Sequence, residues 1–194
     1  MKHPSLQIIH DEHLALAAML QSMRLMVERG PGGKPAQFFE VLRAMLFYID
    51  EFPERLHHAK ETELLFPPVA HASPTVAAAV ERLNRDHAAG ERTVRELQHL
   101  LLAWEMLGET RKAPFMQRCA EYLQFYQEHM RLEETVILPE AERLLTPADW
   151  QQLDEAFARN CDPLTGKFPP DPAYEKLFQR IVNLAPAPIG LGEA

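Results

Sequence analysis

The sequence predicts an all-α protein, an up-down-up-down four-helix bundle followed by one or two short C-terminal helices. Gly is scarce, with 8 in 194 residues, while residues that favour helices, such as Leu, Ala, Glu, Arg and Met, are abundant. Long stretches carry apolar residues at alternating steps of three and four, which is the spacing of one helix face. The connections between these stretches are short, and short connections make neighbouring long helices antiparallel.

Turn and cap residues mark the limits of four long helices, expected at about residues 4–29, 36–66, 75–107 and 114–144. The Gly30-Pro31-Gly32-Gly33 run ends the first helix, and Pro67-Pro68 ends the second. Ser73-Pro74 supplies a cap and a first-turn proline for the third helix. Gly108 and Pro114 flank the connection to the fourth.

Pro53 lies inside the second helix, where it should remove one backbone hydrogen bond and bend the axis. After the bundle we expect a fifth helix from Thr146-Pro147 to about Asn160, an irregular Pro-rich stretch, and a sixth helix over 173–184. The tail 186–190 is expected to be extended.

We therefore divide the chain into a bundle, residues 1–145, and a C-terminal extension with a Pro-rich tail, residues 146–194. The extension could pack over one end of the bundle, cover a pocket mouth, or mediate homodimer formation.

The composition excludes several classes of protein. With 46% hydrophobic and 25% charged residues, the chain is typical of a globular protein. A net charge of -8 argues against nucleic acid as a partner, because no basic face is available to neutralise phosphates. No apolar run reaches the length of about 18 residues that a membrane span needs, and acidic residues interrupt the N-terminus before a signal peptide could form. We expect a cytoplasmic protein.

The most informative motif is a His-x-x-x-Glu pair that occurs three times, together with one further histidine near the N-terminus. These residues are His57 and Glu61, His87 and Glu91, His129 and Glu133, and the single His13. A spacing of four residues places imidazole and carboxylate on one helix face, one turn apart. This combination of ligands suits iron, manganese or zinc. If four helices each point such a set inward, the bundle core holds a metal site, and two ions are our expectation.

The histidines lie where core residues are expected. His13 and His87 each replace an apolar residue in the stripe of their helix, and Gly90 beside His87 makes room for a group close to the backbone. Their apolar neighbours in the stripes include Leu6, Ile9, Leu16, Leu20, Val80, Leu83, Val94 and Leu97. A carboxylate buried in such a core costs several kcal/mol unless a cation balances it. The alternatives are hydrogen-bonded core histidines, or surface pairs worth about 0.3 kcal/mol each.

Two short segments carry a resemblance to the hemerythrin-like family, also called HHE cation-binding domains. The likeness spans roughly residues 6–145. The segments are His57-His58-Ala59-Lys60-Glu61 followed by Leu64-Leu65-Phe66-Pro67, and His129-Met130-Arg131-Leu132-Glu133 followed by Leu138-Pro139. The resemblance implies a non-haem di-iron centre inside a four-helix bundle, for which zinc or manganese could substitute.

Carried over to this chain, the resemblance makes Glu61 and Glu133 the carboxylates that bridge two iron ions. It assigns His13 and His57 to one iron, and His87 and His129 to the other. The chain departs from the oxygen carriers of the family, which have a second histidine where this sequence has Glu91 and an aspartate on the fourth helix. We include Glu91 among the expected ligands.

The resemblance implies a protein that binds or senses O2 or NO, or that handles iron, and it leaves open whether the protein is an enzyme. The alternatives are a di-iron oxidase or peroxidase on the same bundle, and a structural or interaction module with a structural metal. Three neighbouring features are expected to have minor roles. His58 is rotated by about 100° from His57 and should lie at the edge of the site or outside it. Tyr122 and Tyr126 should pack in the core. The acidic residues that include Glu12 and Glu54 should form a solvated face.

Overall fold

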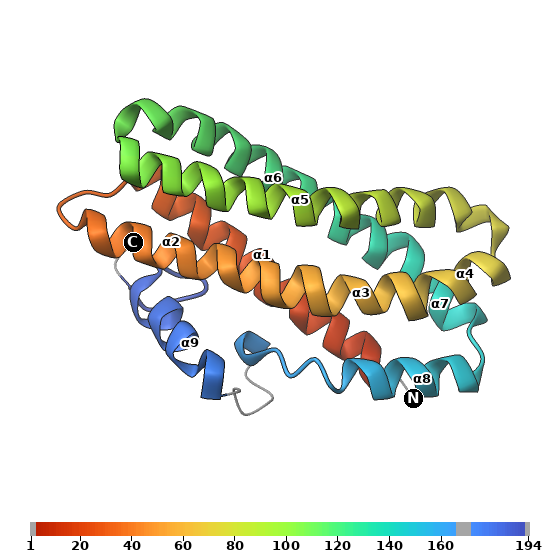
Figure 1. The fold of residues 1–194 in the computed structure, drawn as a ribbon. Helices are drawn as coiled ribbons and strands as arrows, with labels where there is room; N and C mark the ends of the chain where they lie inside the picture. The colour runs from red at the N-terminus through yellow and green to blue at the C-terminus, as the bar shows by residue number, and fades with distance from the viewer. Residues whose placement is uncertain (1–2, 166–171, 193–194) are drawn as a thin grey trace.

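The computed structural model describes residues 3–165 and 172–192, and every regular element within these ranges is helical (Figure 1). Four long helical rods form an antiparallel bundle, which confirms the predicted fold class. The first rod, α1, is a single helix, Pro4–Arg29, and its bounds agree with the prediction. The third begins with a 3-10 turn, η3 (Pro74–Val76), and continues as α5 (Ala77–Leu107).

The second rod runs without interruption beyond its predicted end at residue 66. It consists of α2 (Pro35–Ile49), the π-helical η1 (Asp50–His57), α3 (His58–Lys60), the π-helical η2 (Glu61–Leu65) and α4 (Phe66–Ala72). Pro67 and Pro68 do not end the rod, because they lie in the first turn of α4, where a missing backbone N–H is tolerated. Pro53 lies inside η1, where the backbone has left the α-helical pattern.

The fourth rod has the same construction. A 3-10 turn, η4 (Glu109–Arg111), leads into α6 (Lys112–Leu132), followed by the π-helical η5 (Glu133–Ile137) and by α7 (Leu138–Leu144). A proline again follows the π-helical segment, Pro139 in the first turn of α7. The two π-helical segments η2 and η5 both begin at a glutamate of the predicted metal site, Glu61 and Glu133.

The C-terminal extension packs along the bundle rather than away from it (Figure 1). α8 (Pro147–Phe157) contacts α1, α3 and η2, and α9 (Pro172–Leu184) contacts α2. A 3-10 turn, η6 (Pro163–Thr165), lies between them. Residues 166–171 of the predicted irregular stretch, and the last two residues of the tail, lie outside the described residues. The division of the chain at residue 145 stays a prediction.

The described part of the tail folds back in a turn and is not extended as predicted. The Gly190 amide donates to the Pro186 carbonyl oxygen at 3.2 Å, and Pro186 forms an isolated parallel bridge with Gly192. Glycine is required here, because a Cβ at Gly190 would lie 2.2 Å from the Ala185 carbonyl oxygen.

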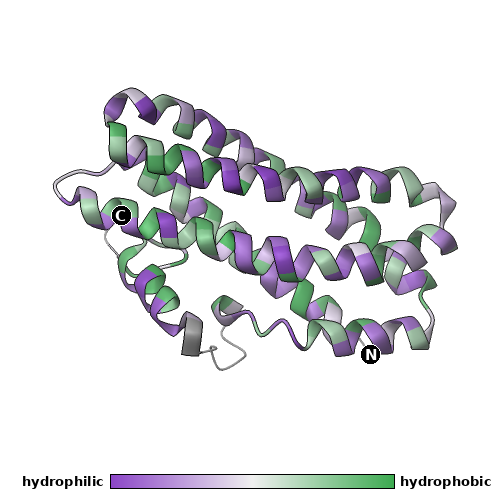
Figure 2. Ribbon diagram, in the orientation of Figure 1, coloured by the Kyte–Doolittle hydropathy of each residue, from purple (hydrophilic) through white to green (hydrophobic). Residues whose placement is uncertain are grey.

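A layer of buried polar residues separates two hydrophobic clusters. Figure 2 shows hydrophilic and hydrophobic residues alternating along each rod, as expected for helices with one buried face. One cluster includes Leu16, Met23, Leu42, Trp104, Phe115 and Tyr126, and also Phe178, Ile181 and Ala185 of the extension. The other includes Ile9, Leu65, Phe66, Leu83, Ile137, Trp150 and Phe157. Along each rod, the predicted metal-binding residues lie between members of the two clusters. Among the described helices, none is long and apolar enough to cross a membrane.

Replacement of Ile181 by alanine tests whether the extension contributes to the core of the bundle. Ile181 is fully buried, so we expect Ile181→Ala to lower the free energy of unfolding by about 2–5 kcal/mol. Urea unfolding followed by helical circular dichroism measures this change, with the exposed Glu175→Ala as control. An unchanged bundle transition in Ile181→Ala would show that α9 is energetically independent of the bundle.

Candidate metal centre

Six of the seven predicted ligands meet in the buried polar layer. All six have relative exposures of 8% or less. They are His13 on α1, His57 at the end of η1, Glu61 at the start of η2, His87 on α5, His129 on α6 and Glu133 at the start of η5. The π-helical turns matter because a wider turn changes which side chains face inward, and such turns occur frequently at functional sites.

The two carboxylates lie between two pairs of imidazoles. Glu61 directs Oε1 to His57 Nε2 at 3.1 Å and Oε2 to His87 Nε2 at 3.5 Å. Glu133 directs Oε2 to His13 Nε2 at 3.3 Å and Oε1 to His129 Nε2 at 3.2 Å. Glu61 therefore faces one imidazole of each pair. Glu133 faces His13 and both imidazoles of the other pair, because its Oε1 also lies 3.6 Å from His87 Nε2. The arrangement separates into two halves, His13 with His57 and His87 with His129, which share both carboxylates.

Eight inward-facing atoms of this group have no hydrogen-bond partner. They are the Nε2 atoms of His13, His57, His87 and His129, and both carboxylate oxygens of Glu61 and Glu133. Buried polar atoms are hydrogen-bonded in nearly all folded proteins, and each orphan costs about 1–3 kcal/mol. Imidazole nitrogens and anionic oxygens are the ligands that iron, manganese and zinc accept. The donor set therefore fits a cation in each half, and the cations would supply the missing partners.

The outward nitrogen of each imidazole has its own polar partner. His57 Nδ1 lies 2.7 Å from Glu12 Oε2, His13 Nδ1 lies 3.0 Å from Glu134 Oε1, and His87 Nδ1 lies 2.8 Å from the Thr62 hydroxyl. His129 Nδ1 faces Asp86 at 3.7 Å, an ion-pair distance longer than a hydrogen bond. When Nδ1 carries the proton and donates outward, Nε2 keeps its lone pair for a metal. The Glu12 and Glu134 carboxylates thus prepare His57 and His13 as ligands, and the Thr62 hydroxyl can accept from His87 in the same way. His129 Nδ1 has no hydrogen-bond partner.

Glu12 is one of the functional residues that sequence reasoning missed. It is buried, 6% exposed, instead of lying on a solvated face. Its Oε2 atom accepts hydrogen bonds from His57 and from Asn160 Nδ2, the latter at 2.9 Å, and Lys60 donates in turn to Asn160. The one signal in the sequence is its place next to His13, because nothing in the spacing relates Glu12 to His57 on another rod.

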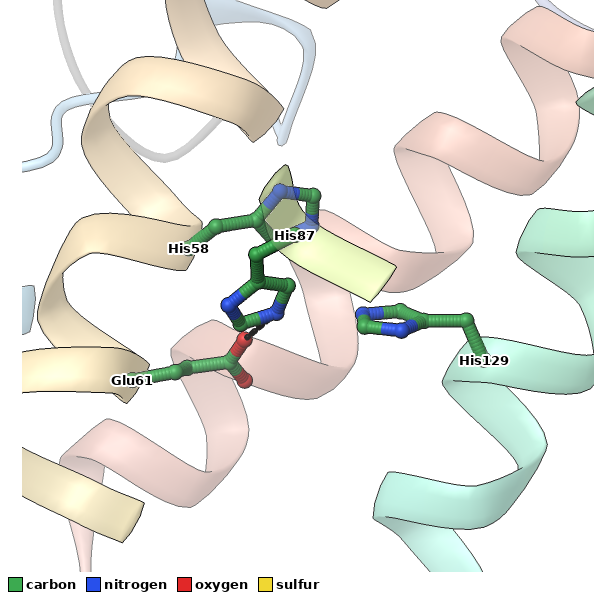
Figure 3. Close-up of side chains that lie close together, drawn as sticks. All are labelled: His58, Glu61, His87 and His129. Carbon is green, nitrogen blue, oxygen red and sulfur yellow. Dashed lines mark ion pairs between the residues drawn. The ribbon is translucent and has the colours of Figure 1, made fainter. Parts of the chain in front are cut away.

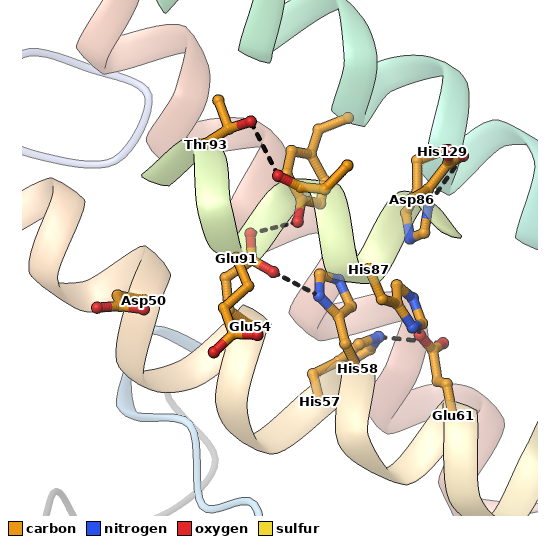
Figure 4. A network of polar contacts seen from close by, with 12 residues as sticks. Asp50, Glu54, His57, His58, Glu61, Asp86, His87, Glu91, Thr93 and His129 are labelled. Carbon is orange, nitrogen blue, oxygen red and sulfur yellow. Dashed lines mark hydrogen bonds and ion pairs between the residues drawn. The ribbon is translucent and has the colours of Figure 1, made fainter. Parts of the chain in front are cut away.

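A second buried network lies beside the site, around Glu54 (Figure 4). Glu54 Oε1 accepts hydrogen bonds from the hydroxyls of Tyr122, at 2.9 Å, and Tyr126, while Oε2 lies 3.1 Å from His58 Nδ1. Burial raises the pKa of Glu54 to about 7, although both phenols favour its ionised form. Gly90 makes room for this network, because a Cβ there would lie 2.3 Å from the Tyr126 hydroxyl oxygen.

His58 is buried beside the site, although the sequence placed it at the edge or outside. It is 4% exposed, and its ring stacks on that of His87 with centroids 4.2 Å apart. Burial and the neighbouring imidazoles of His87 and His129 hold its pKa well below the ordinary value. His58 is therefore neutral at physiological pH.

Glu91 lies outside the group, contrary to the prediction. Its side chain is 47% exposed and accepts a hydrogen bond from Arg95 Nη2 at 2.6 Å. The physical reason is that Tyr126 and Glu54 fill the interior next to Gly90, one residue before Glu91. The carboxylate therefore turns to the surface and pairs with the arginine one turn further along α5.

The charges of the ligands balance one another in the protein without metal. Burial alone would lower the pKa of His129, but Glu133 and Asp86 raise it to about 10. Burial opposes ionisation of Glu133 as well, yet His129, His13 and His87 hold its pKa well below the ordinary value. His129 is therefore protonated at neutral pH, and a metal ion must displace a proton from its imidazole.

Metal affinity should therefore increase with pH. Protons and metal compete for the same Nε2 atoms. Because the pKa of His129 is raised to about 10, this competition continues up to that pH. We expect tighter binding at each step from about pH 6 to about pH 9, with release of protons into a weakly buffered solution. Isothermal titration calorimetry in buffers of different ionisation enthalpy measures both quantities. Binding without proton release would contradict the assignment of these imidazoles.

Glu12→Ala tests the outer partner of His57. Loss of such a partner costs about 10–100-fold in metal affinity, and we expect an effect of this size with helix content unchanged. Chelator competition measures the affinity. Glu28→Ala is the matched control on α1, because Glu28 is exposed and pairs with Arg24. An affinity equal to that of the control would remove Glu12 from the site.

The comparisons with known proteins agree with this geometry. The family model described as hemerythrin HHE cation-binding domain matches residues 5–141, which contain all of the buried histidines and glutamates described above. No curated protein matches the chain. The match covers most of the chain, and the protein belongs to the hemerythrin HHE cation-binding domain family.

Proposed function

We propose that the protein holds two iron ions between Glu61 and Glu133 and uses them to bind or sense a small diatomic ligand, O2 or NO. The observation that carries this proposal is the set of eight buried, unpartnered ligand atoms. His13 and His57 would hold one ion, His87 and His129 the other, and both carboxylates would contact both ions. Two cations would supply the positive charge that Glu61 and Glu133 require, without protons on the four imidazoles.

The ligand chemistry favours iron over softer metals. The group mixes neutral nitrogen and anionic oxygen donors, which suit iron, with zinc or manganese as possible substitutes. No thiolate contributes, because the buried Cys119 belongs to the hydrophobic cluster around Trp104 and the other cysteine of the chain is exposed. Two shared carboxylates within a helix bundle are also the construction of di-iron carboxylate proteins.

A narrow pocket reaches one half of the site and supports binding of a small ligand. His13 and His57 form part of its wall, whereas His87 and His129 do not. Leu16, Phe52 and Met130 give it an apolar side, and Glu12, Asn160 and Asp162 give it a polar one. Bound iron would supply reversible coordination and electron donation to a diatomic molecule. The chain supplies the imidazoles that orient the ion, the carboxylates that balance its charge, and the apolar wall.

The first experiment is elemental analysis of protein expressed with iron, together with its visible spectrum. We expect two irons per chain, with clear loss in His13→Ala and Glu61→Ala and with the helices largely formed in both. His99→Ala is the matched control, because His99 is exposed on α5. Full iron content in both site variants would contradict the proposal.

The same preparation tests the ligand. Anaerobic addition of NO to the reduced protein, and of O2 in a parallel sample, should change the spectrum of the iron. Two irons per chain without any response to either gas would instead indicate a structural metal or iron handling. Consumption of peroxide in the presence of a reductant would indicate an oxidase or peroxidase.

A further inference from the structure

We propose that a pocket at one end of the bundle is a second ligand site, which takes an organic anion with an apolar body, such as a medium-chain fatty acid. The pocket lies between the connection 30–34, which joins α1 to α2, and the described part of the C-terminal tail (Figure 1). Its volume is about 600 Å³, within the range of sites for small molecules.

This pocket is separate from the metal centre. None of its described lining residues is among the side chains that Figure 3 shows, or elsewhere in the buried polar layer. Met26, which lines the pocket, lies about 20 Å along α1 from His13, at 1.5 Å per residue. The inference therefore does not depend on the function proposed above.

The floor of the pocket is apolar and belongs to the core of the bundle. Met26 on α1 and Phe38 and Val41 on α2 line it, and each of them is at most 6% exposed. All three belong to the hydrophobic cluster around Trp104. The rings of Phe38 and Trp104 pack edge to face, with centroids 5.4 Å apart. A well-packed apolar floor is typical of ligand sites, and it suits the hydrocarbon part of an amphipathic molecule.

The tail forms another wall and holds a leucine in water. Leu191 lines the pocket and is 84% exposed. Its backbone is nevertheless fixed, because its amide donates to the Val182 carbonyl oxygen at 2.7 Å and the Gly192 amide donates to that of Ala185 at 2.8 Å. The Ser22 hydroxyl on α1 binds the same turn through two hydrogen bonds. An apolar ligand that covered Leu191 would remove this side chain from water, which is favourable.

The rim of the pocket is basic, although the protein is acidic. Arg29 and Lys34 line the pocket. The Lys112 ammonium group reaches the same connection, since a Cβ at Gly30 would lie 3.6 Å from its Nζ atom. None of the described lining residues is acidic, whereas the whole chain has 28 acidic residues and a net charge of -8. A local excess of positive charge attracts anions, and a carboxylate forms charge-assisted hydrogen bonds with ammonium and guanidinium groups.

The combination of floor and rim selects the class of ligand. An organic cation would be repelled by the rim. A short anion such as acetate has no apolar body to cover the floor and Leu191. A fatty acid meets both requirements, with its carboxylate at the rim and its chain on the floor.

Isothermal titration calorimetry with decanoate tests this site in the full chain. We expect saturable binding of one decanoate per chain, and no comparable binding of acetate or of decyltrimethylammonium. Binding should persist in protein without metal, because the pocket contains no metal ligand. Decanoate binding that requires the metal would place the carboxylate on the metal centre and overturn the proposal.

Two exposed positions test the rim and the wall. Lys34→Glu should weaken decanoate binding by about tenfold or more, because it removes a charged hydrogen-bond donor and adds a repelling carboxylate. Leu191→Ser should weaken binding by removing apolar contact. The matched controls are Lys176→Glu, exposed on α9, and Leu102→Ser, 50% exposed on α5. Neither control residue lines the pocket.

Nuclear magnetic resonance of metal-free protein locates the bound decanoate. The amide signals of Gly32, Gly33 and Gly192, which line the pocket, should shift on titration. Absence of saturable binding, equal binding of decyltrimethylammonium, or the same affinity in Lys34→Glu as in Lys176→Glu would overturn the proposal. The iron content of the protein reports on the metal centre separately, so the two proposals can fail independently.

Discussion

Two glutamates in the middle of the bundle determine much of the surrounding structure. They face one set of imidazoles and have no hydrogen-bond partners. Glu61 and Glu133 are both fully buried, and such carboxylates require positive charge nearby. The four rods meet this requirement, because each of them supplies at least one imidazole that points inward. The two hydrophobic clusters hold the rods together on either side. The apolar packing thus provides the framework in which a charged layer can be enclosed.

The outer partners of the imidazoles make this layer a prepared site. Glu12, Glu134 and Glu54 each face an Nδ1 atom, and they come from different rods. A ligand that is already oriented loses less conformational freedom when it binds a metal. The carboxylates also add negative charge around the two positions. This charge would favour the higher oxidation states of a bound metal ion, because they carry more positive charge.

Apolar spacing was sufficient to predict the four rods and the inward direction of His13 and His87, since both depend on periodicity along one helix. The end of the second rod at residue 66 was wrong, because π-helical segments tolerate the prolines that follow them. The prediction for Glu91 was wrong because a side chain from another rod fills the interior space beside Gly90. Glu12 was missed for a related reason, because its partner His57 lies on another rod. Glu54 and His58 are four residues apart, so the spacing that identified the three His-x-x-x-Glu pairs could have found this contact.

Asn160 donates to Glu12 from a segment that follows the family match, which ends at residue 141. The environment of His57 is thus assembled from two parts of the chain that can vary separately in evolution. Substitutions after the bundle can adjust the basicity of His57 while every ligand stays the same. Family members with identical ligands but different extensions should therefore differ in metal affinity and redox behaviour, and ligand identity alone is a poor guide to their physiological roles.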